Sequence, residues 1–248
     1  MIINHKYKFI FFKSLKVGGT SMEIALSKFT SDNDIVTRIM VDEEEALRGN
    51  LGINSKNAGS LVNHSSAADL LKFLESPQYK DKDIFNSYFK FTIIREPIDL
   101  FISQHSYQRY TWADRSPPFP FMKPPKNINN WIKKIKRRRF NGIGTNISEQ
   151  NWNIYSLNNK PITDDYITYS KDSGPGSKMY EDCTRISEKL NFPENLADIF
   201  YNTRVKTQYR PKDKVKLSKE SIDFIEEVSK IEREFTGMEL AREEYETI

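Results

Sequence analysis

The residues with the clearest chemical potential lie in segment 11–26, which reads FFKSLKVGGTSMEIAL. In it an apolar run gives way to Lys16, a glycine pair and the hydroxyl residues Thr20 and Ser21, after which helical spacing resumes. A glycine turn that leads into a helix aims several backbone N–H groups and the helix dipole at one point, and such a point binds phosphate. Segment 16–21 is therefore either an anion site or a glycine turn followed by a helix cap.

The order of lysine and glycine narrows the choice of anion. The loop that binds ATP and GTP requires G-x-x-x-x-G-K-[ST], with the lysine after the glycines. Here Lys16 precedes Gly18 and Gly19, so the segment does not fit that loop. A nucleotide kinase is disfavoured for the same reason.

The order K-x-G-G-T-S after a buried strand resembles the 5′-phosphosulfate loop of sulfotransferases that use PAPS (3′-phosphoadenosine 5′-phosphosulfate) as donor. Leu15 stands where this loop usually has proline. The resemblance, to the carbohydrate-type branch, implies that the donor is held by Lys16, Val17, Gly18, Gly19, Thr20 and Ser21. It also implies that PAP is the desulfated product. No metal is expected, since Lys, Arg and backbone N–H groups meet the donor's charges.

The same resemblance implies a second signature, in which an arginine at the end of a later strand and a serine eight residues on bind the 3′-phosphate. The stretch IIREPIDLFISQ supplies Arg95 and Ser103 at that separation. At about 100° per residue, an apolar stripe runs from Ile98 to His105, and Ser103 lies roughly opposite it. The alternative is a solvated serine on an exposed helix face.

Sulfuryl transfer to a hydroxyl needs a base, which in this family is a histidine or a glutamate. Of the three histidines, His5 precedes the first predicted strand at the amino end of the sheet, away from where ligands bind. His105 lies on an apolar helix stripe and is expected in the core. His64 lies between a strand and a helix, and we predict that it acts as the base together with Lys16, which stabilises charge on the donor. A turn or capping role for His64 is the alternative, and Glu96 is then the base.

The strands and helices that position these residues are predicted to form three strand–turn–helix units. Strands over Phe9–Phe12, up to about Val62 and over 89–94 each run into a helix, and Thr20 with Glu23 fits a capping box for the first one. Further predictions are a strand over 35–41, a short helix within 42–58, a basic helix over 129–140, a strand over 165–169, and helices over 178–190 and 218–235. The units predict an α/β fold with a parallel central sheet flanked by helices. The resemblance implies a P-loop-like three-layer sulfotransferase architecture and a single domain over 1–248.

Two further segments stand out by composition. Segment 112–127 holds five prolines and is expected to form a loop or flap. A basic run comprises Lys133, Lys134, Lys136, Arg137, Arg138 and Arg139. Such a run is usually a solvated helix face, and an anionic acceptor is the other interpretation. Arg204, Lys206 and Arg210 lie where related enzymes carry a basic loop near the 3′-phosphate.

Composition sets outer limits on function. The 248 residues carry 38 Lys and Arg against 34 Asp and Glu, a formal charge of +4, which suits an anionic ligand and is too weak to indicate nucleic acid. The single Cys183 excludes an internal disulfide and a multi-cysteine metal site. No apolar stretch reaches the roughly 20 residues of a membrane span, and we expect a cytoplasmic protein without a membrane partner.

The sequence therefore predicts a sulfotransferase that moves a sulfuryl group from PAPS to a hydroxyl, or less readily an amine, of a small-molecule or carbohydrate acceptor. The rival from another class is a basic module for RNA or another polyanion, built around residues 131–140. That module would explain the basic run and would leave the glycine loop and the Arg95–Ser103 pair as coincidences.

Overall fold

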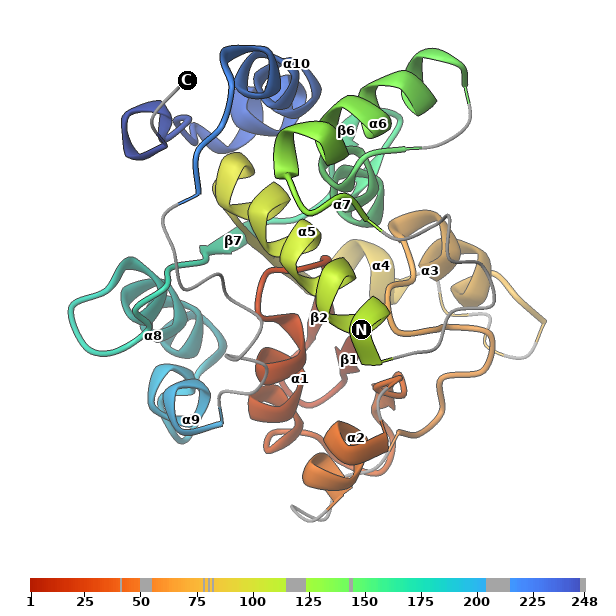
Figure 1. Ribbon diagram of the computed structural model, residues 1–248. Coiled ribbons are helices and arrows are strands. Elements are labelled where there is room, and N and C mark those ends of the chain that lie inside the picture. The colour runs from red at the N-terminus through yellow and green to blue at the C-terminus, as the bar shows by residue number, and fades with distance from the viewer. Residues whose placement is uncertain are drawn as a thin grey trace. The chain divides into compact units, whose positions relative to one another are not determined.

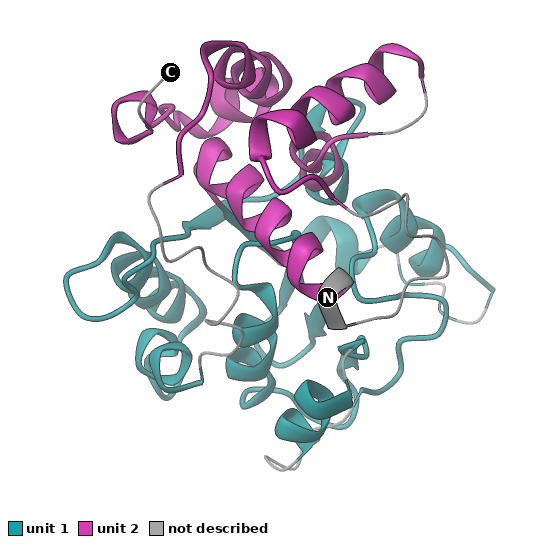
Figure 2. Cartoon of the chain, in the orientation of Figure 1, with its two compact units in different colours: residues 1–94, 153–205 teal, residues 95–152, 206–248 magenta. Residues whose placement is uncertain are grey.

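The computed structural model describes residues 1–40, 42–49, 55–77, 79, 81, 83–114, 124–142, 145–203 and 215–245 (Figure 1). The chain divides into two compact units (Figure 2), one comprising residues 1–94 and 153–205 and the other residues 95–152 and 206–248. Each unit is described by itself below as unit 1 and unit 2. The single domain over 1–248 stays a prediction.

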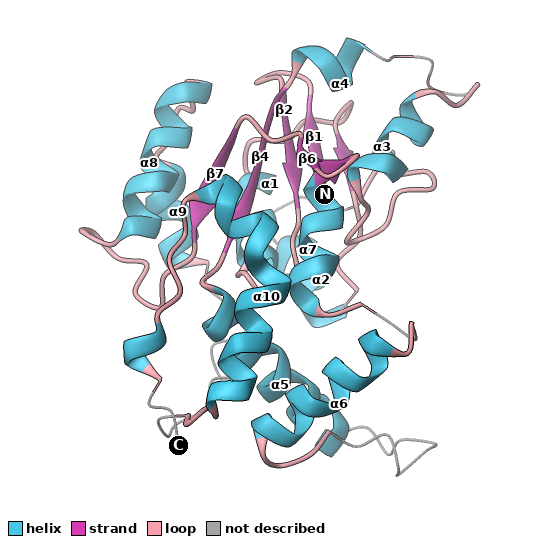
Figure 3. Cartoon of the chain, turned by 90° about the horizontal axis from the view of Figure 1, so that it is seen from above, coloured by secondary structure: helices cyan, strands magenta, loops and turns pink. Residues whose placement is uncertain are grey.

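Unit 1 is built on a five-stranded sheet in the order β3-β1-β2-β4-β7 (Figure 3). Its strands are β1 (Ile2–Asn4), β2 (Phe9–Phe12), β3 (Ile35–Val36), β4 (Phe89–Ile94) and β7 (Asp165–Thr168). The neighbours β2, β4 and β7 are parallel, whereas β1 runs antiparallel to both β2 and β3. The prediction of an α/β fold with a parallel central sheet flanked by helices is confirmed for β2, β4 and β7, and the antiparallel pairing of β1 makes the sheet mixed at that side.

The central strands β2 and β4 are largely buried, and β2 is apolar on both faces, whereas β4 carries Lys90 and Thr92 on one face. All four residues of β2 are buried, as expected for a strand covered on both sides. The Phe91 ring of β4 lies 5.7 Å from the ring of Phe9 and 5.3 Å from that of Phe11, measured between centroids. Aromatic packing of this kind fixes the register of the two strands whose carboxyl ends carry the candidate site residues.

The helices of unit 1 are α1 (Gly19–Ser27), α2 (Asp42–Gly49), α3 (Ala67–Leu74), α4 (Asp83–Ser87), α8 (Lys178–Leu190) and α9 (Leu196–Asn202). A small hairpin joins β5 (Ser156–Leu157) to β6 (Lys160–Pro161). Helix α8 packs against β7 and against α9, and α9 in turn packs against α1. The single cysteine, Cys183, is buried on α8, and burial raises the pKa of its thiol.

Unit 2 is helical. It contains α5 (Pro97–Asp114), α6 (Ile128–Phe140), most of α7 (Ile147–Tyr155), α10 (Lys219–Thr236) and a 3₁₀ turn at Arg242–Glu244. Phe101 on α5 packs against two of the other helices. Its ring centroid lies 6.2 Å from that of Trp131 on α6 and 6.4 Å from that of Phe224 on α10. Among the described helices, none combines the length and apolar composition needed to cross a membrane.

The predicted strand ending near Val62 is wrong. The described residues 57–66 form consecutive turns, in which Leu61 N donates to Ala58 O at 2.8 Å and Ser65 N donates to Val62 O at 3.1 Å. These turns satisfy the backbone groups locally, and Val62 itself is 62% exposed. The following helix was predicted correctly, and Ser66 caps it through a hydrogen bond from Asp69 N.

Three other boundaries differ from the sequence predictions. The strand predicted over 35–41 is only Ile35–Val36, and the first strand of the sheet is β1, which the sequence analysis missed. β1 spans three residues and is too short to show periodicity. The predicted flap over 112–127 is wrong at its start, since α5 continues to Asp114, while residues 115–123 lie outside the described part of the chain.

Candidate functional site

The loop between β2 and α1 turns sharply at two residues with a left-handed backbone. Lys16 has φ of 61° and Gly18 has φ of 79°. Such a conformation is easy for glycine and uncommon for lysine, and turns of this kind direct successive N–H groups into an anion-binding concavity. The start of the loop is anchored to the sheet, because the Ser14 hydroxyl lies 3.0 Å from the Thr92 hydroxyl on β4.

Helix α1 begins at Gly19, and the predicted capping box is wrong. Gly18 is the N-cap residue, and within the described chain no side chain caps this helix. Met22 N donates to Gly18 O at 3.1 Å and so closes the first turn. Thr20 and Ser21 lie in this first turn, where backbone N–H groups and the helix dipole favour an anion. Glu23, the expected partner of Thr20, is buried elsewhere, as described below.

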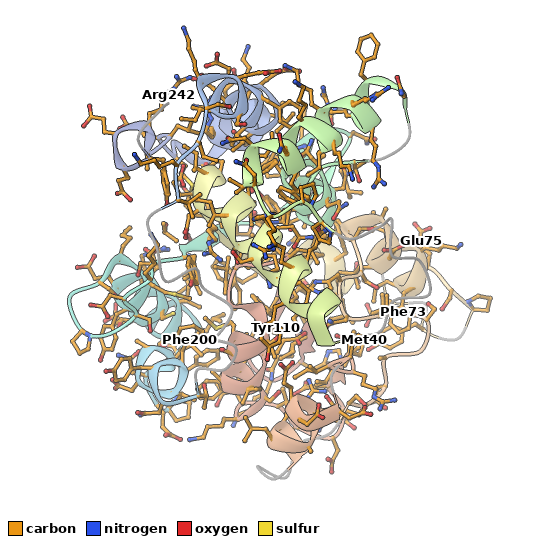
Figure 4. The ribbon with its side chains drawn as sticks, in the orientation of Figure 1. Met40, Phe73, Glu75, Tyr110, Phe200 and Arg242 are labelled. Atoms are coloured by element: carbon orange, nitrogen blue, oxygen red, sulfur yellow. The ribbon has the colours of Figure 1, made fainter. Side chains whose placement is uncertain are left out.

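The two glycines of the loop are needed for different reasons. A Cβ on Gly19 would lie 2.8 Å from Lys13 Cγ and 3.3 Å from Ser14 O, so the loop has no room for a side chain there. A Cβ on Gly18 would make ordinary contacts with Tyr169 and with Phe200 of α9 (Figure 4), so its positive φ is what requires glycine. The lysine stem and the helix start are therefore in direct contact at Gly19.

A buried ion-pair network lies beside the loop. Lys13 Nζ donates to Glu23 Oε2 at 2.6 Å and to Asn63 Oδ1 at 2.7 Å. Glu23 Oε1 accepts from the α-amino group of Met1 at 2.5 Å. Burial alone would raise the pKa of Glu23, but the charges and hydrogen bonds of Lys13 and the α-amino group lower it to about 2. Glu23 is therefore a carboxylate at neutral pH.

His64 is attached to the same lysine through the backbone. Its Nδ1 lies 2.9 Å from the carbonyl oxygen of Lys13. A carbonyl only accepts hydrogen bonds, so Nδ1 carries the proton and Nε2 of the neutral ring carries the lone pair. Burial is the main cause that lowers the pKa of His64, the hydrogen bond to the Lys13 carbonyl opposes it, and the Lys13 ammonium and the Met1 α-amino group add to the lowering, so that the pKa is about 4. The ring is therefore neutral at pH 7 and able to accept a proton at Nε2.

Arg95 and Ser103 belong to unit 2, where Arg95 lies two residues before α5 and Ser103 lies in the second turn of that helix. Arg95 directly follows β4 in the chain and is 6% exposed. Its Nε donates to Asp99 Oδ2 at 2.8 Å, and its Nη2 forms an ion pair with the same oxygen at 2.7 Å. Burial lowers the pKa of Arg95 while Asp99 raises it, and the guanidinium stays charged. Ser103 is half-buried, and His105 on the predicted apolar stripe is 7% exposed.

Glu96, the alternative base, is occupied by backbone contacts. Its Oε2 accepts from Asp99 N at 2.7 Å and its Oε1 accepts from Ala241 N at 3.2 Å. Burial raises the pKa of Glu96, and these hydrogen bonds only partly offset that rise. The carboxylate therefore caps α5 and tethers the segment that follows α10, which supports a structural role.

Comparison with known families decides the identity of the fold. The model of the sulfotransferase family matches residues 1–235, a range that includes the β2–α1 loop as well as Arg95 and Ser103. The chain belongs to the sulfotransferase family. Searches of curated proteins and of solved structures gave no match.

The other two histidines of this sulfotransferase hold structural positions. His5 lies in the turn between β1 and β2, at the amino end of β2, where its Nδ1 is 2.8 Å from Tyr88 Oη and its Nε2 is 3.2 Å from Tyr79 Oη. The His105 Nε2 is 2.8 Å from the carbonyl oxygen of Pro125. Both rings are held by hydrogen-bond partners, and the choice of His64 as the base stays a prediction.

The basic run of the sulfotransferase lies on α6, and part of it is paired. Lys136 contacts Glu220 at 3.3 Å, and Arg139 contacts Glu149 at 2.7 Å and Glu227 at 3.1 Å. These exposed pairs favour the solvated helix face over a ligand site. The predicted basic loop with Arg204, Lys206 and Arg210 lies outside the described residues.

Sequence reasoning missed Lys13, Glu23 and Asn63 as parts of the site. From the sequence alone, Lys13 resembles the polar residue that ends an apolar strand, and Asn63 resembles an ordinary turn residue. Their contacts span 10 and 50 positions of the chain, and no local pattern carries such pairs. Within the described residues, no group of three or more His, Cys, Asp or Glu side chains is placed to hold a metal ion.

Proposed function

We propose that this sulfotransferase moves the sulfuryl group of PAPS to a hydroxyl of an acceptor, with an amine as the second choice, and releases PAP. The observation that carries the proposal is the loop with left-handed Lys16 and Gly18 that runs into the uncapped amino terminus of α1. Backbone N–H groups at that point, with the Lys16 ammonium and the hydroxyls of Thr20 and Ser21, suit the 5′-phosphosulfate.

The reaction is an in-line displacement at sulfur. The acceptor oxygen forms a new S–O bond as the bond between sulfur and the bridging phosphate oxygen breaks. The acceptor proton passes to Nε2 of His64, which the Lys13 carbonyl keeps unprotonated. Lys16 stabilises the charge that grows on the bridging and leaving oxygens, and as in phosphoryl transfer, positioning and charge neutralisation provide most of the rate.

The pKa of His64 responds to the donor. Without ligand it is about 4, lower than a base at neutral pH requires. A polyanion bound at the adjacent loop favours the imidazolium and raises this pKa toward the working range. In this proposal, donor binding therefore prepares the base for proton transfer.

For the 3′-phosphate we propose Arg95 and Ser103, the pair that the family resemblance implies. The guanidinium supplies charge-assisted hydrogen bonds and the serine supplies a neutral one. A carbohydrate hydroxyl is the acceptor class that the family resemblance implies, and the cytoplasmic location stays a prediction.

Calorimetry with PAP tests the proposal. We expect PAP to bind with a sub-millimolar dissociation constant and to compete with PAPS, and we expect no preference for ATP. Binding of ATP in preference to PAP would support a kinase, and binding of RNA without binding of PAP would support the basic module. Either result would overturn the proposal.

A further inference from the structure

We propose that Lys13 is a positioning residue that joins the donor loop, helix α1 and the turn carrying His64 into one unit and so fixes the ring of His64 for proton transfer. This inference rests on the proposed function. The residue contacts two separate segments of the chain, helix α1 and the turn with Asn63 and His64, and each carries a group assigned to the reaction.

Four contacts of Lys13 define this arrangement. Its Cγ lies against Gly19, where an added Cβ would come within 2.8 Å. Its Nζ reaches Glu23 on α1 at 2.6 Å and Asn63 in the turn at 2.7 Å. Its backbone oxygen accepts from His64 Nδ1 at 2.9 Å. One residue thus contacts the loop glycine, the helix that follows the loop, and the base with its sequence neighbour.

The side chain of Lys13 contacts Asn63 in the turn, and the backbone carbonyl of Lys13 contacts the ring of His64. Asn63 and His64 are consecutive, so the Nζ–Oδ1 contact and the Nδ1–O contact fix two successive residues of one turn to a single lysine. Removal of the first contact leaves the ring attached only by the second. We therefore expect His64 to sample other orientations and the other tautomer when Asn63 loses its amide.

Stability alone does not account for the network. The side chain of Lys13 is 3% exposed and that of Glu23 is 0% exposed, so both charges are desolvated. Desolvation of a buried pair can exceed the attraction between its charges, and apolar replacements of such pairs are often neutral or stabilising. A role in orienting the base explains why the chain keeps the pair beside the loop.

The titratable groups that act on the pKa of His64 are the Lys13 ammonium, the Met1 α-amino group and the Glu23 carboxylate. Substitution of Lys13 changes this balance as well as the geometry. The sharper test therefore starts at Asn63, which is uncharged and whose substitution leaves the Lys13–Glu23 pair intact.

The experiment compares Asn63→Ala, Asn63→Asp and Lys13→Met with the wild-type chain. The tautomer of His64 is read from the ¹⁵N shifts of the ring in the full-length protein, assigned with His64→Gln. We expect the Nδ1–H form in the wild type, a mixture of tautomers in Asn63→Ala and Lys13→Met, and restoration in Asn63→Asp, which keeps an acceptor oxygen for Nζ. Sulfuryl transfer should slow about 10–100-fold in Asn63→Ala and in Lys13→Met, as for other residues that orient a reactive group. The affinity for PAP should stay unchanged in both variants.

Lys90→Met is the matched control. Lys90 is another buried lysine, 7% exposed, whose Nζ donates to Tyr88 O at 2.7 Å and lies 3.6 Å from Asp164. Its substitution should lower stability in the same way while leaving the His64 tautomer and the transfer rate as in the wild type.

The two ideas fail separately. An unchanged Nδ1–H tautomer in both Asn63→Ala and Lys13→Met would overturn the positioning role even if the wild type transfers sulfuryl groups normally. A wild type that binds no PAP would overturn the proposed function, while the tautomer measurement would still report on Lys13. A tautomer shift in Lys90→Met as large as that in Asn63→Ala would mean general loosening and would also overturn the positioning role.

Discussion

Arg95 contacts a single carboxylate oxygen of Asp99 twice, through a hydrogen bond from Nε at 2.8 Å and through an ion-pair contact from Nη2 at 2.7 Å. Because the Arg95 and Asp99 side chains are only 6% and 14% exposed, this pair fixes the guanidinium plane at the start of α5 before any nucleotide binds. A guanidinium oriented in advance loses less side-chain freedom when it meets a phosphate.

The first prediction separates the 3′-phosphate from the rest of the donor. Arg95→Ala should weaken PAP binding by roughly 10–100-fold and Ser103→Ala by a few-fold, since hydrogen bonds to charged groups contribute about 1.5–3 kcal/mol and neutral ones about 1 kcal/mol. Adenosine 5′-phosphosulfate lacks the 3′-phosphate and should bind all three proteins alike. Calorimetry with both nucleotides measures this, and equal losses for the two would exclude Arg95 and Ser103 from 3′-phosphate recognition.

Arg95→Ala should also lower the melting temperature, since it removes the ion pair between the buried guanidinium and the half-buried Asp99 carboxylate. Ser103→Ala leaves no buried charge and should melt as the wild type does. It is therefore the cleaner variant for the binding measurement.

The second prediction concerns Lys16, which is half-buried in the donor loop. Lys16→Ala should reduce the rate of sulfuryl transfer by about 10²–10³-fold, the size of comparable oxyanion effects, with little change in circular dichroism or melting temperature. Lys16→Arg keeps the charge and should retain part of the activity. A fully active Lys16→Ala enzyme would remove this loop from the mechanism.

The third prediction concerns the base. His64→Ala should slow transfer by about 10²–10⁴-fold and leave PAP affinity nearly unchanged, because the ring acts on the acceptor proton. His105→Gln serves as the control and should leave transfer intact, since the His105 ring contacts the carbonyl oxygen of Pro125 and has no role in the proposed reaction. Near-normal turnover of His64→Ala, combined with an inactive Glu96→Gln, would assign the base to Glu96.

The fourth prediction follows from the lowered pKa of His64. The folded value is about 4 and the ordinary value is 6.5, so between these pH values the unfolded chain binds more protons than the folded one. His64 therefore contributes full stability above pH 6.5 and loses that contribution as the pH falls toward 4, by about 3 kcal/mol at 1.36 kcal/mol per pKa unit.

Urea unfolding of the wild type and of His64→Gln at pH 7, 5.5 and 4 checks this value. The free energy of unfolding of the wild type should fall more steeply than that of the variant as the pH drops, because all other groups titrate in both proteins. Parallel pH profiles would show that the ring is not held neutral by the fold.

Local patterns were sufficient for the elements that carry the site. The apolar runs of β2 and β4 and the stripe from Ile98 to His105 predicted two strands and the buried side of α5 correctly, since each is visible within a few residues. The Thr20–Glu23 capping box was wrong for the opposite reason. Glu23 has the right spacing, but its partners Met1 and Lys13 come from other strands and loops, and these long-range charges determine where it lies.

The strand predicted near Val62 failed in a similar way. Leu61 and Val62, just before His64, resemble the end of a buried strand. Hydrogen bonds within the turns of residues 58–65 pair with the backbone there, so this segment does not join the sheet. The placement of His64 at Lys13 therefore depends on a contact 51 positions away along the chain. Sequence spacing alone contains no trace of that contact.

Because the thiol of Cys183 is buried, the native chain should react little with thiol-directed labelling reagents. It is the only cysteine among 248 residues, it is 0% exposed, and burial raises the pKa of its thiol, so the thiolate that reacts with maleimides and methanethiosulfonates is scarce. A cysteine introduced at Phe140, which is 90% exposed at the end of α6, or at Met40, which is 72% exposed, would carry a spin label or fluorophore selectively. Site-directed spectroscopy on this sulfotransferase can thus begin from the unmodified sequence.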